Sequence, residues 1–246
     1  MNIPVEDVHM PASPRPCNTH ADLIRFRHDL PHLTESLRKQ RKIKIVAIGS
    51  SSTAGENEGD VIPYPPRLEM LLRQGFHHRM IDVLNRGLSG EEAPSQVSRF
   101  EPDVIAEQPA LVIWQVGTNA IFRQEAFNPD DVMVAVTSGL RWLKELPTDV
   151  VMMDLQYTPA LVEGAKLAAS MDMVGRISRA AQDAGVNVFR RFDLMRHWVI
   201  QDGISIADLV REGDGAKLHE SEWATGCVTR ALFEQIMARL QAAGVS

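Results

Sequence analysis

The feature that most constrains this chain is the alternation of short apolar segments with longer amphipathic ones from residue 43 to the C-terminus. The apolar segments comprise residues 43–48, 80–84, 111–116, 150–155 and 186–189. Short segments that are apolar at nearly every position are typical of strands buried on both faces of a parallel sheet. The stretches between and after them show helical spacing, at 66–74, 95–107, 130–145, 164–184 and 221–243. This order predicts an α/β fold with a doubly wound, mainly parallel five-stranded sheet.

The N-terminal part has a different character. Residues 1–19 contain four prolines and are expected to form an irregular arm, and residues 21–40 resemble helical material broken near Pro31. We therefore expect two parts, an N-terminal arm and helix at residues 1–42 and one α/β domain at residues 43–246. A chain of 246 residues can bury a large core without disulfides or metals.

Charge and composition exclude several classes of function. The formal net charge is -6 and no basic stripe is visible, so nucleic-acid binding is not expected. No apolar run is long enough for a membrane span, and residues 1–11 lack the basic and apolar regions of a signal peptide. We expect a soluble protein, cytoplasmic as the sequence is written, and periplasmic or secreted if a leader has been removed.

The cysteines and histidines give no metal or redox motif. The two cysteines, Cys17 and Cys227, form no CxxC pair, so a zinc knuckle or a dithiol redox centre is not expected. We expect two free thiols. One disulfide that joins the arm to the last helix remains an open alternative. The adjacent His77 and His78 have no carboxylate or histidine at helical ligand spacing, so no metal site is predicted there.

Three polar, glycine-bearing turns follow the first three apolar segments, at residues 49–55, 85–90 and 117–119. Ligands bind at the carboxyl ends of the strands in such sheets, so these turns should lie on one rim. The first turn contains Ser51 and can present a hydroxyl nucleophile, cradle a phosphate or simply cap a helix. The phosphate-loop pattern fails because no lysine follows Gly55, and the GxSxG pattern fails because Thr53 replaces its second glycine.

The remaining candidates are donors and a base. The backbone N–H of Gly87 and the side-chain amide of Asn119 can each donate to an oxyanion, although a tight turn and a helix N-cap are the plain alternatives. His219 lies in a polar segment before the last amphipathic stretch, with Asp214 shortly upstream. A histidine beside an acid suits a general base and the residue that orients it, whereas a histidine alone in a loop is more often a surface residue.

Taken together, these turns resemble the SGNH hydrolase superfamily, which is named for its Ser, Gly, Asn and His. The family's block Gly-Asp-Ser-x-Thr-x-Gly resembles residues 49–55, and Asn-x-Gly-x-Ser-Gly matches residues 85–90 in full. The block Gly-x-Asn-Asp resembles residues 117–120, and the final Asp-x-x-His ends at His219. The resemblance implies a three-layer α/β/α sandwich of the flavodoxin-like SGNH type. It also implies Ser51 as nucleophile, His219 as base, and an oxyanion hole made by Ser51, Gly87 and Asn119, with no cofactor or metal.

Three positions depart from the family pattern. The Asp of the first block is Ser50, and the Asp after Asn119 is Ala120. The larger departure is Ala216, three residues before the histidine, because an alanine cannot orient an imidazole. We assign the acid role to Asp214, which a bulged loop would bring to the ring. The alternatives are Asp208, Asp202 or a main-chain carbonyl.

The resemblance implies a serine hydrolase that cleaves carboxylic esters through an acyl-enzyme on Ser51. Aromatic residues make up 6% of the chain and no long apolar lid is evident, which favours short acyl groups over long lipid chains. Because the family includes carbohydrate O-acetyl esterases, the resemblance implies acetyl esters of carbohydrates or small alcohols as substrates. Two alternatives remain: an O-acyltransferase that uses the same residues, and an inactive carbohydrate-binding domain on the same fold.

Overall fold

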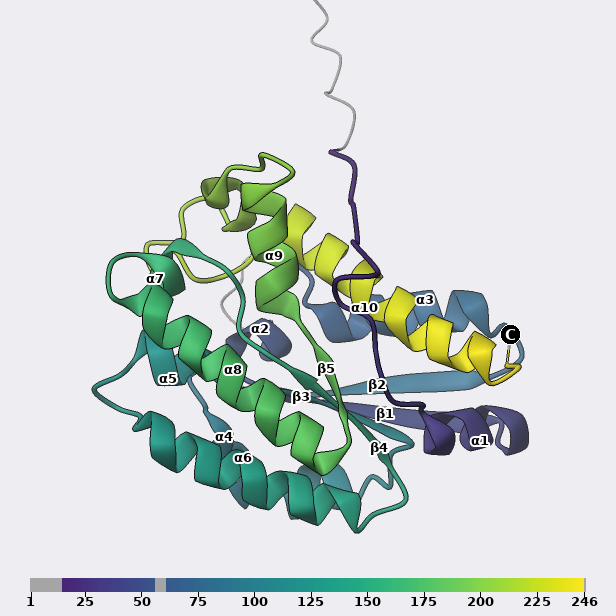
Figure 1. Cartoon of the computed structure of the whole chain (residues 1–246). Helices are drawn as coiled ribbons and strands as arrows, with labels where there is room; N and C mark the ends of the chain where they lie inside the picture. Colours follow the sequence, from purple (N-terminus) through teal and green to yellow (C-terminus); the bar gives the residue numbers. More distant parts are fainter. Residues whose placement is uncertain (1–14, 56–60, 246) are drawn as a thin grey trace, which may run out of the picture.

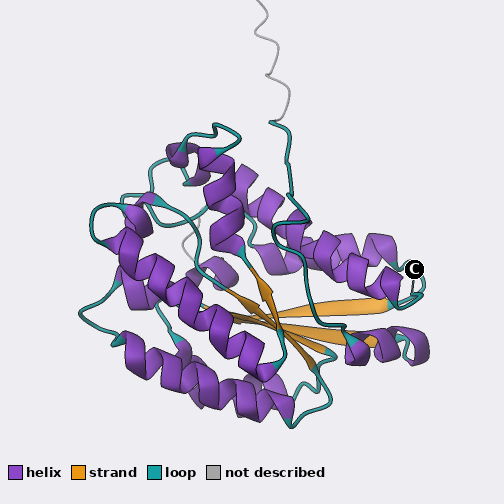
Figure 2. Ribbon diagram, in the orientation of Figure 1, coloured by secondary structure: helices purple, strands orange, loops and turns teal. Residues whose placement is uncertain are grey.

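A five-stranded parallel sheet forms the centre of the molecule, as the sequence predicts. The computed structural model describes residues 15–55 and 61–245. The strands are β1 (Lys42–Gly49), β2 (Met80–Gly87), β3 (Leu111–Gln115), β4 (Asp149–Met153) and β5 (Asn187–Phe189). All neighbouring pairs are parallel, and the spatial order is β2-β1-β3-β4-β5 (Figures 1 and 2). This is the order of the flavodoxin-like doubly wound fold.

Helices cover both faces of the sheet and make three layers. α3 (Tyr64–Gly75) and α10 (Glu222–Ala242) pack together on one face. On the other face, α6 (Pro129–Lys144) packs between α4 (Ala93–Ser98) and α8 (Lys166–Ala184). The shorter elements are α1 (Pro31–Lys39), α2 (Ser51–Ala54), a π-turn (Glu101–Ile105), α5 (Thr118–Phe122), α7 (Pro159–Val162), α9 (Arg191–Ile200) and a 3-10 turn (Ile206–Leu209).

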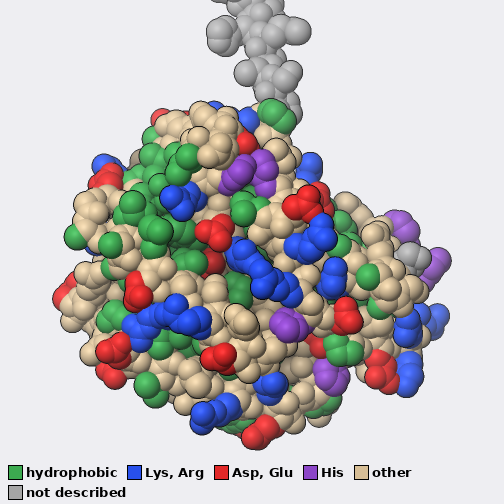
Figure 3. Space-filling view, viewed as in Figure 1, with side chains coloured by type: hydrophobic (Ala, Val, Ile, Leu, Met, Phe, Trp, Pro, Cys, Tyr) green, Lys and Arg blue, Asp and Glu red, His purple; other side chains and the backbone are tan. Residues whose placement is uncertain are grey.

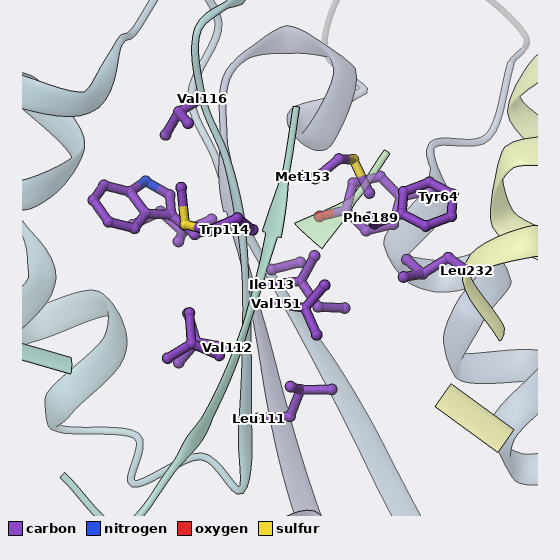
Figure 4. Close-up of a cluster of buried hydrophobic side chains, with 14 of the residues drawn as sticks. Tyr64, Leu111, Val112, Ile113, Trp114, Val116, Val151, Met153, Phe189 and Leu232 are labelled. Carbon is purple, nitrogen blue, oxygen red and sulfur yellow. The ribbon is translucent and has the colours of Figure 1, made fainter. Parts of the chain in front are cut away.

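Side chains alternate across the central strand β3. Ile113 points towards Tyr64 of α3 and Leu232 of α10, whereas Trp114 points to the opposite face (Figure 4). The side chains of Ile113, Trp114, Tyr64 and Leu232 are each at most 2% exposed. The strand β3 therefore has buried apolar side chains on both faces. Burial on both faces explains why its sequence shows no polar alternation.

Three predicted helical stretches differ from the observed ones. Of residues 21–40, only Pro31–Lys39 forms a helix, α1. The stretch 95–107 divides into α4 and the π-turn, because Pro102 has no N–H to continue the α-helical ladder. The stretch 164–184 becomes α8, which begins at Lys166 after the separate α7. The helix α9 was not predicted. Its buried residues include the charged Arg191 beside apolar ones, so it lacks the clean polar face that marks an amphipathic helix.

The described part of the arm, from residue 15, is docked along the body of the molecule (Figure 1). A disulfide joins Cys17 to Cys227 of α10, with the two Cα atoms 5.5 Å apart. The expectation of two free thiols is therefore wrong. The pair is 210 residues apart in the chain, and such a separation leaves no spacing pattern in the sequence. Further along, Phe26 and Leu30 are 1% exposed and belong to the same core as the sheet.

The division at residue 42 stays a prediction, and residues 1–14 of the expected arm lie outside the described residues. Within residues 15–55 and 61–245, no helix combines the length and the apolar character needed to cross a bilayer.

Candidate active site

The candidate residues lie where the order of the strands reverses. The chain goes from β1 to β2 on one side, and then returns to add β3 on the other side of β1. Such a reversal leaves a crevice at the carboxyl ends of the two strands, where doubly wound sheets bind ligands. Ser51 is the first residue of α2 directly after β1, and Asn119 lies in α5 directly after β3. Gly87 is the last residue of β2.

The turn before Ser51 is fixed by Gln115 of β3. The side-chain oxygen of Gln115 accepts the N–H of Ser50 at 2.8 Å and its hydroxyl at 2.9 Å. A Cβ at Gly49 would lie 2.3 Å from Oγ1 of Thr53 and 2.7 Å from that same Gln115 oxygen, so only glycine fits there. Ser50, the residue in place of the family's Asp, is 1% exposed and anchors the turn, and Ser51 beside it is half-buried.

Gly87 lies against the backbone of the same turn. It is in register with Gly49, and an added Cβ would lie 2.2 Å from the backbone nitrogen of Ala54. Its N–H donates to Oδ1 of Asn85 at 3.0 Å, and Nδ2 of Asn85 donates to the carbonyl of Ala54 at 3.0 Å. Asn85 therefore ties the end of β2 to α2, and the Gly87 N–H already has one acceptor within the protein.

The turn that carries Asn119 is held by the carbonyl of Glu91 and by the side chain of Glu92, a buried glutamate that the sequence analysis missed. One N–H of the Asn119 amide donates to the carbonyl of Glu91 at 2.8 Å, and no acceptor for the second N–H is found among residues 15–55 and 61–245. The neighbouring Glu92 is 1% exposed and accepts the N–H groups of Gly117 at 2.8 Å and Ala120 at 3.1 Å. Burial raises the pKa of the Glu92 carboxyl, and these backbone hydrogen bonds oppose that rise.

Asp214 lies against His219, although it is five residues upstream rather than three. Oδ2 of Asp214 is 3.1 Å from Nδ1 of His219 and accepts the N–H groups of His219 at 2.8 Å and Leu218 at 2.9 Å. Lys217 takes a left-handed backbone conformation with φ 52°, so the loop folds tightly around the carboxylate. With the Nδ1 proton shared with Asp214, Nε2 of the ring is left to accept a proton.

The surroundings of Asp214 favour its ionised form. Partial burial acts to raise the pKa of this carboxyl, but the N–H groups of His219 and Leu218 and the nearby imidazole outweigh that effect. The net result is a pKa below the usual aspartate value. A carboxylate that stays charged at neutral pH can stabilise an imidazolium.

The other two candidate acids pair elsewhere. Asp202 lies 2.7 Å from Nε2 of His20, and Asp208 lies 2.6 Å from Nη2 of Arg15. Asp214 is therefore the carboxylate that the described residues place at His219.

A buried arginine joins the segments that carry Ser51 and His219. Arg191, the first residue of α9, is 1% exposed. Its Nη1 donates to the hydroxyl of Ser52 at 3.2 Å and to the carboxylate of Glu220 at 3.3 Å. Since Ser52 follows Ser51 and Glu220 follows His219, both segments meet at one nitrogen atom.

The same arginine also connects to the third turn. Its Nη2 donates to Oε1 of Gln156 at 2.9 Å, and the hydroxyl of Thr118 donates to that oxygen at 2.9 Å. Nε2 of Gln115 donates in turn to the Thr118 hydroxyl at 3.2 Å. A continuous buried network therefore runs from the β1 turn, through Thr118 beside Asn119, to the segment before α10.

Sequence reasoning missed Glu92, Gln156 and Arg191. Glu92 follows the second polar turn and Arg191 follows the fifth apolar segment, and both places lie at the carboxyl ends of predicted strands. Those positions were a weak indication that the two residues belong to the site. Their burial was not visible, because a buried charged residue and an exposed one look the same in a single sequence.

Comparisons with known proteins identify the family and the fold. The model of the Non-GDSL lipase-like family matches residues 16–242. An acetylxylan esterase from Geobacillus stearothermophilus is 26% identical over 130 residues, which are 48% of this chain. The match spans 58% of that relative's length.

Solved structures share the fold. The crystal structure of an acetylxylan esterase from Geobacillus stearothermophilus covers 79% of this chain and 94% of its own, with a TM-score of 0.66 and 19% identity. The α/β hydrolase enzyme LAE5 from the metagenome of Lake Arreo, Spain, covers 79% of this chain and 96% of its own, with a TM-score of 0.65 and 18% identity. At these identities the structures establish the fold. Since the family model spans most of the sequence, the resemblance to SGNH hydrolases is confirmed, and the chain belongs to the Non-GDSL lipase-like family.

Proposed function

We propose that this protein is a serine-dependent carboxylic ester hydrolase that removes acetyl groups from carbohydrates or small alcohols. The observation that carries the proposal is the Asp214–His219 pair, which the Arg191 network joins to the turn that bears Ser51. Family membership and the match to an acetylxylan esterase support the same reaction class.

In the first half-reaction, the hydroxyl oxygen of Ser51 attacks the ester carbonyl carbon while Nε2 of His219 takes the hydroxyl proton. The ionised Asp214 stabilises the resulting imidazolium through Nδ1. The imidazolium then gives its proton to the departing alcohol oxygen as the carbon–oxygen bond of the ester breaks. The product of this step is an acetyl group esterified to Ser51 and a free alcohol.

The negative oxygen that forms during each attack needs hydrogen-bond donors. The N–H of Ser51 and the second amide N–H of Asn119 are the principal donors in this proposal. The N–H of Gly87 joins them as a shared donor, because it already contacts Asn85. In the second half-reaction, His219 removes a proton from water, the hydroxide oxygen attacks the acetyl carbonyl, and acetate leaves as Ser51 regains its proton.

An acyl-chain series tests the proposed substrate class. Initial rates are measured on p-nitrophenyl acetate, butyrate and octanoate, and acetate release is measured from acetylated xylo-oligosaccharides. We expect the highest kcat/KM on the acetyl ester and acetate release from the oligosaccharide. Faster cleavage of the octanoate, or transfer of acetyl to an added sugar in place of release as acetate, would contradict the proposal.

We also propose that the protein works in an oxidising compartment, outside the cytoplasm. Disulfides persist in such compartments and are rare in cytosolic proteins, so the Cys17–Cys227 bond supports this location. Mass spectrometry after alkylation of the protein from its native host tests the point. Unlabelled cysteines are expected, and two alkylated thiols would contradict the proposed location.

A further inference from the structure

A cluster of two histidines and one aspartate lies away from the candidate active site, where the arm crosses the end of α9. His20 comes from the arm, His197 from the last turns of α9, and Asp202 from the segment just after that helix. One ligand-type atom from each lies within 4.8 Å of the others. Histidine side chains gather on the surface beside the arm, near the upper end of α9 in this view (Figure 3).

We propose that this cluster binds one divalent transition-metal ion, with Zn²⁺ as the best match. Two imidazole nitrogens and one carboxylate oxygen form a donor set that suits Zn²⁺, with water at the remaining position. At metal–ligand bonds of about 2.0–2.1 Å, two donors on a tetrahedral ion lie roughly 3.3 Å apart. Nε2 of His20 is now 2.7 Å from Oδ2 of Asp202, and the His197 donor lies within the 4.8 Å limit, so side-chain shifts on the order of 1 Å suffice.

The hydrogen bonds of the three side chains leave room for an ion. Within the described ranges, Asp202 forms an ion pair with His20 and none with a lysine or arginine. Among the same residues, the ring nitrogens of His197 make no hydrogen bond, although its ring centroid is 4.2 Å from that of His20. A cation would therefore bind a carboxylate that is not paired with a lysine or arginine and an imidazole whose two ring nitrogens make no hydrogen bond among the described residues.

The backbone around His20 is fixed before any ion binds. The disulfide of Cys17 anchors the arm to α10, and the carbonyl of Asn18 accepts the indole N–H of Trp198 at 2.7 Å. His20 itself has a left-handed φ of 42°, which is uncommon for a residue other than glycine. Because these contacts already order the segment, an ion would not have to provide the free energy to order it.

An ion bound to this cluster would link the arm to the C-terminal end of α9. The expected consequence is a structural role, in which the ion stabilises the folded state by mass action. At a free Zn²⁺ concentration 100 times the Kd, the unfolding temperature should rise by about 5–10 °C.

The test uses full-length protein freed of metal with a chelator. Zn²⁺ binding is measured by isothermal titration calorimetry, and the unfolding temperature is recorded with and without Zn²⁺. All variants carry His219→Ala, so that the candidate active site cannot bind the ion. We expect one high-affinity Zn²⁺ and a clear rise in the unfolding temperature.

Two variants and a control decide the outcome. His197→Ala and the isosteric Asp202→Asn should each weaken Zn²⁺ affinity at least about 10-fold and remove most of the thermal shift. A control that replaces the exposed His77 and His78 by alanine should keep the Zn²⁺ affinity and the rise in unfolding temperature. The proposal would be overturned if the protein with His219→Ala alone bound no Zn²⁺. It would also be overturned if His197→Ala and Asp202→Asn were folded and bound Zn²⁺ with unchanged affinity. Loss of binding in the His77 and His78 control would also overturn it, since it would place the ion elsewhere.

Discussion

Ser52 and Glu220 accept hydrogen bonds from one atom, Nη1 of Arg191, at 3.2 Å and 3.3 Å. Each acceptor is the chain neighbour of a residue proposed to react, Ser51 or His219. The two segments come from opposite ends of the domain sequence, and the guanidinium fixes the distance between them. A buried arginine in this position acts on the reaction through the placement of other groups, so we regard it as a positioning residue.

Replacing Arg191 should therefore lower kcat more than it raises KM. Arg191→Met alone leaves Glu220 buried without a partner, so the informative variant also carries Glu220→Gln. We expect kcat on p-nitrophenyl acetate to fall about 10- to 100-fold, because displacements near 1 Å are costly in rate. Arg176→Met, which removes an arginine that pairs with the exposed Asp130, is the matched control. A folded double variant with the parent kcat would show that Arg191 does not position the site.

Asp214→Asn should reduce kcat by about 10²- to 10⁴-fold with little change in fold. An asparagine cannot balance the imidazolium charge, and its amide hydrogens would face the N–H groups of His219 and Leu218. Asp208→Asn serves as the comparison, because that carboxylate pairs with Arg15 instead. Steady-state kinetics on the acetyl ester distinguish the two variants. Equal losses in both, or a loss confined to Asp208→Asn, would refute the assignment of Asp214.

Asn119→Ala should lower kcat about 10²- to 10³-fold and leave KM nearly unchanged, because the donor acts on the negative oxygen of the transition state. Glu92→Gln should produce part of the same loss, since its amide cannot accept as many backbone N–H groups as the carboxylate does. Both kinetic parameters are measured on the acetyl ester. If the loss instead appeared only in KM, Asn119 would be a substrate-binding group without a role in stabilising the oxyanion.

Asp154 should make the fold less stable as the pH rises. Burial raises the pKa of this carboxyl to about 7, and Asp193 adds to the rise, whereas hydrogen bonding and Arg191 oppose it. Below the ordinary value of 3.8 the carboxyl is neutral in both the folded and the unfolded chain. Between that value and about 7 the unfolded chain ionises first, so this group lowers the unfolding free energy over that window.

The measurement is a comparison of Asp154→Asn with the parent protein by thermal unfolding at two pH values. We expect the variant to unfold several degrees higher than the parent protein at about pH 8. The difference in unfolding temperature should be smaller at about pH 5. If this difference in unfolding temperature instead increased as the pH fell, the folded protein would stabilise the charged form of Asp154.

The parallel sheet was predictable from five short apolar segments that alternate with amphipathic ones, whereas the flavodoxin-like arrangement of its strands followed from the resemblance to SGNH hydrolases. The turns after β1, β2 and β3 were found for the same reason, since each follows a recognisable strand. The placement of Asp214 depended on a loop around Lys217 whose left-handed backbone no sequence pattern indicates. The sequence left the Cys17–Cys227 disulfide as an open alternative, because nothing in it shows that the two residues are close. The contact of His20 with Asp202 was not foreseen, because nothing local marks the partner of either residue.

Ser51→Ala tests the central claim most directly, with acetyl-ester hydrolysis as the measurement and Ser89→Ala, an exposed serine of the second turn, as the control. The account predicts that the Ser51 variant stays folded and loses at least about 10³-fold in kcat, while the Ser89 variant stays near the parent rate. Undiminished hydrolysis by folded Ser51→Ala protein would contradict it, because the acetyl group would then be released without the proposed acyl-enzyme.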